Sequence, residues 1–185
     1  MIFKKQIFPV FFLLFIFLSF SLKSNNIATV NISYILENNL QYQEYLDHLL
    51  NKKEKVSKIF SQKENLIIEK KKEIENLENI IQADELNKKI LEYNKIYEDF
   101  LKKVNDFNQI FNDNLIVNEE IMMNKIVNII KDISSSQKID IVLSENNFII
   151  SSDNLDISKL VNNELDNIKI EFINFNEKEY INENF

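Results

Sequence analysis

Hydrophobic residues recur at alternating steps of three and four along two stretches in the middle of the chain. The first stretch follows Leu46, Leu49, Lys53, Val56, Phe60, Lys63, Ile67, Lys70, Ile74, Leu77 and Ile81, and the second follows Leu86, Ile90, Tyr93, Tyr97, Phe100, Val104, Phe107 and Phe111. Such spacing keeps a stripe on one face of a supercoiled helix. Because only the short break at 82–85 separates the stretches, the pattern predicts two long helices folded into an antiparallel hairpin.

Three lysines occupy positions of the first stripe: Lys53, Lys63 and Lys70. One interpretation is that they loosen the hairpin so that its arms can flex. The other, which we favour, is that their aliphatic stems are buried while the ammonium groups reach water or a nearby acid.

The first helix is expected to begin near Tyr34 or Leu40, with Ser33 as a candidate N-cap, and to end at the break. The return helix should run from about Asp84 to about Ile133.

The stripe of the return helix changes phase after Phe111, where Asn114 and Asn118 take the expected apolar positions. Apolar residues then resume in a new frame at Met122, Ile126, Ile129 and Ile133. Since a phase shift marks a change of packing partner, we expect the helix to leave the hairpin here and to enter a globular body.

Short β-rich segments flank the hairpin at 27–32, 139–143 and 147–151, and residues 144–146 suit the turn of a β-hairpin. A last amphipathic helix is expected after Asp153 or Asp156, with one apolar face of Ile157, Leu160, Val161, Leu165 and Ile168. The acidic stretch 170–185 has no predicted structure. The expected fold class is therefore mainly α with a small β body, in which a long antiparallel coiled-coil hairpin is inserted between short strands.

Three short strands with exposed edges make a poor sheet alone, so we expect them to pair between subunits. The strand residues predicted to mediate oligomerisation are Ala28, Val30, Ile32, Ile139, Ile141, Leu143, Phe148 and Ile150.

The N-terminus has the pattern of a secretory signal peptide. Two lysines precede an apolar run at 7–18, and the small-x-small triplet 19–21 follows. Cleavage is expected after Ser21 or Ser24, and an uncleaved anchor is the alternative, although the run is shorter than the roughly 20 residues of a spanning helix. Removal of 1–21 takes away Lys4 and Lys5 and no acid, which moves the net charge from −7 to −9.

Composition excludes several classes of chemistry. The chain has no Gly, no Cys and one His, and all its basic residues are Lys. Without Gly it lacks the phosphate-binding loops of nucleotide-binding proteins, and without Cys it lacks disulfides and thiolate zinc sites. We therefore expect no enzyme, no metal and no cofactor. Net negative charge together with export disfavours nucleic acid as a partner.

The order of these segments resembles the Skp/OmpH family of periplasmic chaperones. The resemblance rests on IATVNI at 27–32, the long hairpin, and the closing segments QKIDIVL at 137–143, NFIISS at 147–152 and DISKL at 156–160. It covers about residues 27–168. It implies a homotrimer in which three subunits join strands into a small barrel and three helical arms surround a cavity. It further implies an ATP-independent periplasmic holdase, whose cavity binds unfolded outer-membrane proteins and prevents their aggregation.

Typical members of that family are basic, whereas this chain is acidic and lacks Arg, so no lipopolysaccharide site is assigned. On this layout we expect a signal at 1–21, an oligomerisation body from 22–43 and 112–169, an arm at 44–111 and an acidic tail at 170–185.

Apolar residues beside the two stripes are the candidate client-binding residues. They are Leu50, Ile59, Leu66, Ile68 and Ile80 on the first arm, and Leu91, Ile96, Leu101 and Ile110 on the return. Such a row could line a cavity and hold an unfolded chain at many weak points. The alternative is a wider hairpin core, because core-facing helices often use three positions per heptad.

A structural coiled-coil adaptor or spacer in the cell envelope is the competing function. It would be tethered through an uncleaved N-terminal segment and would have a specific folded partner. Peripheral contact with a membrane is left open by the sequence.

Overall fold

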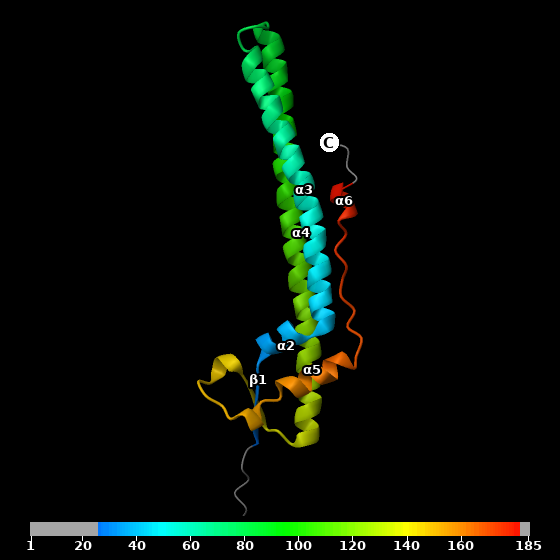
Figure 1. Ribbon diagram of the computed structural model, residues 1–185. Coiled ribbons are helices and arrows are strands. Elements are labelled where there is room, and N and C mark those ends of the chain that lie inside the picture. The colour runs from blue at the N-terminus through cyan, green and yellow to red at the C-terminus, as the bar shows by residue number, and fades with distance from the viewer. Residues whose placement is uncertain (1–25, 182–185) are drawn as a thin grey trace, which may run out of the picture.

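The computed structural model describes residues 26–181, so the predicted signal at 1–21 lies outside the described residues. Two long antiparallel helices form an arm that rises from a smaller body (Figure 1). Helix α3 (Leu40–Leu77) runs outward and helix α4 (Ala83–Gln137) returns. At about 1.5 Å per residue, their lengths are roughly 57 and 83 Å, so α4 continues past the start of α3 into the body. The predicted helical hairpin is confirmed.

The two stripes meet along the arm, and their packing is tightest in the half nearest the body. Val56 and Phe60 of α3 and Phe100 and Phe107 of α4 are all buried. The ring of Phe60 lies edge-on to that of Phe107, with centroids 5.4 Å apart. Towards the tip, the stripe residue Ile90 is exposed, so the arm is less well packed there.

Lys53 shows how a lysine is accommodated on the stripe. Its side chain is half-buried, and its ammonium nitrogen lies 4.5 Å from the centroid of the Phe111 ring. A cation above an aromatic face is attracted to the ring. This contact favours the interpretation in which the lysine stem packs within the seam.

The turn at the tip precedes the predicted break. Helix α3 ends at Leu77, residues 78–82 form the turn, and Gln82 is the N-cap of α4. Asp84 and Glu85 therefore lie in the first turn of α4 rather than in a loop. Acidic side chains stabilise a helix N-terminus because they interact favourably with the positive end of the helix dipole.

The body contains a two-stranded parallel sheet. Strand β1 (Ile27–Val30) pairs with β2 (Ile141–Ser144), with Ile27 opposite Ile141 and Val30 opposite Ser144. Parallel strands need a long crossover connection, and here that connection is the whole hairpin. Strands β1 and β2 thus pair within one chain, and the expected pairing between subunits stays a prediction.

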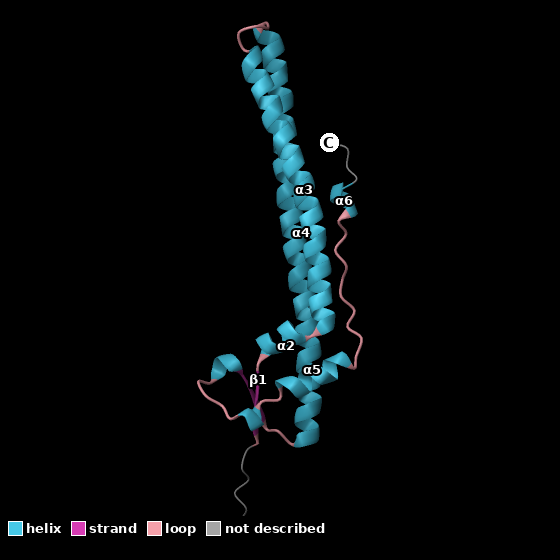
Figure 2. Ribbon diagram, in the orientation of Figure 1, coloured by secondary structure: helices cyan, strands magenta, loops and turns pink. Residues whose placement is uncertain are grey.

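The predicted third strand at 147–151 is wrong for this structure. A 3₁₀ turn, η1 (Glu145–Asn147), follows β2 and an irregular segment leads to a second one, η2 (Asp153–Leu155) (Figure 2). The Glu145 carboxylate accepts hydrogen bonds from the backbone N–H groups of Ile32 (3.0 Å) and Ser33 (3.2 Å). These bonds hold the chain, directly after β2, against the helix that begins at Ile32. The chain then returns to β1, where Ile157 N–H donates to the Thr29 carbonyl.

The helix boundaries in the body depend on asparagine caps. Helix α2 (Ile32–Asn38) is capped by Asn31, which accepts from Tyr34 N–H, rather than by the expected Ser33. The fully buried Asn39 caps α3 by accepting from Tyr42 N–H. The first helix was expected to begin near Tyr34 or Leu40, and the structure has a helix that begins near each position, α2 and α3.

Helix α4 ends four residues after the expected Ile133, and its C-cap is Lys138 in the left-handed conformation (φ 58°). Among the described residues, Lys138 is the only non-glycine residue with positive φ. Helix α5 (Ser158–Asp166) is the predicted last amphipathic helix, and it packs Val161 and Leu165 against α4 and α2. The core of the body also includes Val30, Ile35, Met122 and Ile126.

The C-terminal segment, for which no structure was predicted, runs back from α5 along the arm and ends in the short helix α6 (Lys178–Ile181) (Figure 1). We call residues 169–181 the tail.

Candidate functional site

Most of the predicted client-binding residues are exposed on the arm. Exposure is largest at Ile80 (74%) in the tip turn, Leu91 (69%) on α4 and Leu66 (64%) on α3. The other exposed members of the set are Leu50, Ile68, Leu101 and Ile110, whereas Ile59 and Ile96 are half-buried beside the seam. The arm therefore presents apolar side chains on both helices and at its tip.

A groove with a volume of about 400 Å³ brings two of these residues together. Leu66 of α3 and Ile96 of α4 line it, next to the seam residue Ile67. Its remaining lining residues are charged: Lys63, Lys70, Asp99 and Lys103. An apolar floor with a charged rim suits an amphipathic chain segment better than a compact polar ligand.

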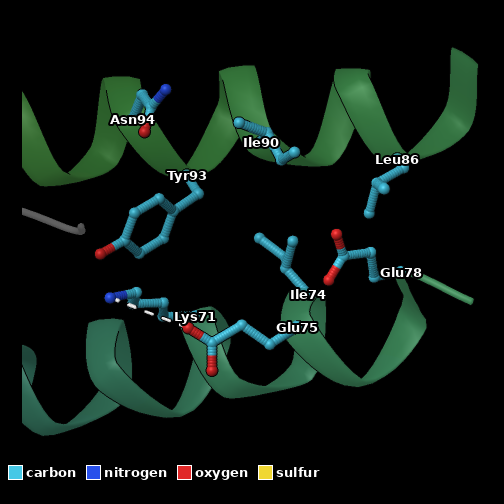
Figure 3. Close-up of a pocket in the computed structure, with 8 residues that line it drawn as sticks. All are labelled: Lys71, Ile74, Glu75, Glu78, Leu86, Ile90, Tyr93 and Asn94. Atoms are coloured by element: carbon cyan, nitrogen blue, oxygen red, sulfur yellow. Dashed lines mark ion pairs between the residues drawn. The ribbon is translucent and has the colours of Figure 1, made fainter. Parts of the chain in front are cut away.

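A second hollow, of about 260 Å³, lies inside the seam near the tip. Figure 3 shows Ile74 pointing across from α3 towards Ile90, Leu86 and Tyr93 of α4. The ion pair between Lys71 and Glu75, at 3.8 Å, lies at its edge. Side chains that border a void lose dispersion contacts, so this part of the hairpin is held together more weakly than the part near the body.

The tail covers a face of the arm nearer the body. We call this face, made of Gln41, Tyr42, Tyr45, Lys52, Phe107, Phe111, Asn114 and Asn118, the tail-binding face. Phe175 of the tail is buried, with ring centroids 5.7 Å from Phe107 and 6.0 Å from Phe111. Tyr180 is buried 5.2 Å from Phe107.

Nearer the body, Phe172 stacks on Tyr45 with centroids 4.7 Å apart. Burial raises the pKa of Tyr45, so its phenol stays protonated and donates to Asn114. The tail thus extends the aromatic core of the hairpin outward.

Side-chain amides of the arm hold the backbone of the tail. Asn118 accepts from Ile173 N–H (2.6 Å) and donates to Ile173 C=O (3.0 Å). Gln41 accepts from Ile170 N–H (3.0 Å) and donates to Ile168 C=O (2.9 Å). In the sequence Asn118 only marked a phase shift. In the structure it is fully buried, and its two hydrogen bonds to Ile173 make it a binding residue for the tail.

Lys52 makes the electrostatic contact between arm and tail. Its ammonium donates to Phe175 C=O and forms an ion pair with Glu177 at 3.0 Å. A hydrogen bond to its own backbone and the contacts with Lys52 hold the pKa of Glu177 below its usual value.

The predicted oligomerisation residues divide into two groups. Ala28 and Val30 are buried in the core of their own chain, and Ile32, Ile139, Leu143 and Phe148 are half-buried. Ile141 is exposed at the sheet, and Ile150 is 88% exposed next to a fully exposed Ile149. Ile141 and Ile150 are the two of the eight that are exposed, and the part of the whole set in association stays a prediction.

Within residues 26–181, no group of three or more His, Cys, Asp or Glu side chains is arranged to hold a metal ion. No helix in the same range is long and apolar enough to cross a membrane.

Sequence reasoning missed the tail and its binding face. The signal was present as six large apolar residues between 169 and 181, of which Ile170, Phe172, Phe175 and Tyr180 are the ones buried or half-buried in the structure. Their spacing follows no single helical or strand period, so periodicity alone does not detect a segment that is extended at its start and helical at its end.

The comparisons with known proteins agree with this architecture. The family model described as "Outer membrane protein (OmpH-like)" matches residues 26–165. A crystal structure of an OmpH-like protein from Caulobacter crescentus CB15 is similar in fold, with a TM-score of 0.72 and 12% sequence identity. The match covers 82% of this chain and 89% of that one. No curated protein matches the chain.

Proposed function

Because this chain belongs to the OmpH-like family, we propose that it is a periplasmic holdase chaperone, which binds unfolded outer-membrane proteins and prevents their aggregation without ATP. The observation that carries the proposal is the set of apolar side chains exposed along the arm, above all Leu66, Ile80 and Leu91. The similar Caulobacter protein has itself been proposed as an outer membrane chaperone. The proposal involves no chemistry on the client, and so no catalytic residue.

The energetics of such a surface suit a reversible holder. Full burial of one leucine or isoleucine side chain contributes about 1.5–3 kcal/mol, and partial coverage of an exposed one contributes less. A client that covers several of these residues at once gains avidity, although each contact alone is weak. Release then needs no nucleotide, because contacts break one at a time.

We propose that the protein acts as a homotrimer. A two-stranded sheet is marginal alone, and an exposed strand edge offers unpaired N–H and C=O groups to another chain. In the described residues, β2 pairs on one side only, and Ile149 and Ile150 lie exposed close after it in the chain. Added strands from neighbouring subunits would satisfy that edge and cover these isoleucines. Three arms could then enclose one client.

Suppression of aggregation tests the holdase. The chain from Leu22 onward is mixed with an outer-membrane β-barrel protein diluted out of urea, and light scattering is followed without ATP. We expect scattering to fall towards zero near three subunits per client. Unchanged scattering would contradict the proposal and would favour the adaptor, for which a folded partner would then be sought.

Matched substitutions connect the activity to the arm. Replacing Leu50, Leu66 and Leu91 by Ser should weaken suppression, since all three are exposed apolar residues of the arm. Replacing the exposed polar neighbours Asn51, Asn65 and Glu92 by Ser is the control and should leave suppression intact. Sedimentation equilibrium at micromolar concentration tests the trimer, and a monomer would rule out the enclosed cavity.

A further inference from the structure

The tail is bound to the arm in the way that a peptide ligand is bound to a receptor. Among the described residues, its backbone forms no hydrogen bond with the backbone of another element. It is held instead by side chains of the arm, from Gln41, Lys52, Asn114 and Asn118. These side chains contact peptide N–H and C=O groups, which every amino acid except proline offers in full.

The first part of the tail has the alternation of a β-strand. Ile170 is buried and Phe172 is half-buried against the arm, while Glu171 and Ile173 between and after them are exposed. An extended chain places successive side chains on opposite sides, so one side meets the aromatic rings and the other meets water. Asn118 and Gln41 hold the backbone of this extended part.

This combination fits one class of ligand closely. Strands of outer-membrane barrels alternate apolar and polar residues and carry aromatic girdles, and in the unfolded state their backbone is free to be hydrogen-bonded. The tail-binding face supplies stacking partners in Tyr45 and Phe107, backbone partners in Asn118 and Gln41, and one cation, Lys52.

We propose that the tail-binding face is a binding site for extended, aromatic-bearing client segments, and that the tail occupies it in the absence of client. The inference rests on the proposed holdase function and adds a specific site to it. The tail competes as an intramolecular ligand, at an effective concentration in the millimolar range for a short tether. A client already held on the exposed residues of the arm presents its strand segments at a comparable local concentration, so exchange becomes possible.

The test uses the full mature chain and a fluorescein-labelled peptide with the sequence of residues 169–181, read out by fluorescence anisotropy. Phe175→Ala removes a buried ring from the tail without altering the face. In wild type, the apparent affinity for the peptide is reduced because the tail already occupies most of the binding faces. The variant frees these faces and should therefore bind the peptide about tenfold more tightly than wild type. Asn174→Ala is the control, because that side chain is exposed and should leave the affinity unchanged.

Two further variants guard against misfolding. Glu177→Lys weakens the tail through its ion pair with Lys52 and should also tighten peptide binding. Asn118→Ala, placed in the Phe175→Ala background, removes the backbone clamp and should weaken peptide binding at least about tenfold, a loss of roughly 1.4 kcal/mol. Circular dichroism confirms that each variant keeps its helices.

Unfolded outer-membrane protein is then titrated against the bound peptide, and we expect it to displace the peptide. Equal peptide affinity in wild type, Phe175→Ala and Glu177→Lys would overturn the inference. Peptide binding that the client does not compete with would also overturn it, because the face would then serve exchange of tails between subunits. Light scattering measured on wild type tests the holdase function separately. Failure of the inference about the tail can therefore be distinguished from failure of the holdase function itself.

Discussion

Phe107→Ala should be the most damaging single substitution in the arm. The Phe107 side chain is fully buried and its ring has four aromatic neighbours, whose centroids lie 5.4 Å (Phe60), 6.1 Å (Phe111), 5.7 Å (Phe175) and 5.2 Å (Tyr180) from its own. It therefore joins α3, α4 and the tail at one point.

The expected loss follows from burial and ring contacts. Truncation of a buried phenylalanine to alanine costs about 3–5 kcal/mol, and each favourable aromatic pair adds about 0.5–1.5 kcal/mol beyond its buried area. Two of the four neighbours belong to the tail, which can move away and let water fill the space. That relaxation limits the loss, so we expect about 3–4 kcal/mol in the free energy of unfolding.

The assay is urea unfolding followed by circular dichroism, at one fixed protein concentration because association would shift the midpoint. Ile110→Ala is the control on the same helix, since Ile110 is exposed and should change stability by less than about 1 kcal/mol. A Phe107→Ala loss as small as that of the control would refute the packing argument.

Four other predictions concern the body and the overall charge. Lys138→Gly should raise stability by about 0.5–1 kcal/mol, because glycine adopts the left-handed C-cap at lower cost; a lower thermal midpoint would contradict this. Asn39→Ala should cost about 1–2 kcal/mol in urea unfolding through loss of the α3 cap, whereas exposed Asn38→Ala should cost far less. Burial alone would raise the pKa of Glu145, but hydrogen bonds from the backbone, including those of Ile32 and Ser33, outweigh it and lower the pKa. The resulting stabilisation is present above the unfolded-state pKa of about 4.3 and is lost as the pH falls through the lower folded-state pKa. The stabilities of wild type and Glu145→Gln should therefore converge in acid. A stability difference that is independent of pH would contradict this prediction. Because the chain is acidic, affinity for acidic clients should change little between low and high salt, and a steep loss with added salt would contradict that expectation.

The long-range pattern of the arm was predictable because it depends on local periodicity. A stripe at steps of three and four residues defines which face of a helix is apolar, and two such stripes around a short break leave few alternatives to a hairpin. The phase shift at Asn114 and Asn118 was visible for the same reason. What occupies those positions was not predictable, because the partner is a segment about 55 residues away in sequence.

The errors lie where local signals compete with tertiary contacts. Residues 147–151 have strand-forming composition, but the bonds from Glu145 to the start of α2 redirect the chain before a strand can form. Ser33 is a good capping residue by type, yet Asn31 occupies the position from which a side chain reaches Tyr34 N–H. The break at 82–85 was placed too late in the chain, because the turn occupies 78–82, whereas the return helix begins within one residue of the expected Asp84.

Sequence alone determined the helical hairpin, its position between β-rich segments and the apolar residues beside its seam, since all three depend on spacing along one chain. Tertiary structure alone decided that β1 and β2 pair within the subunit, and that the tail completes the aromatic core of the arm. Those contacts join residues more than 60 positions apart, and each is selected by competition among many possible partners for the same hydrogen bonds and the same buried surface.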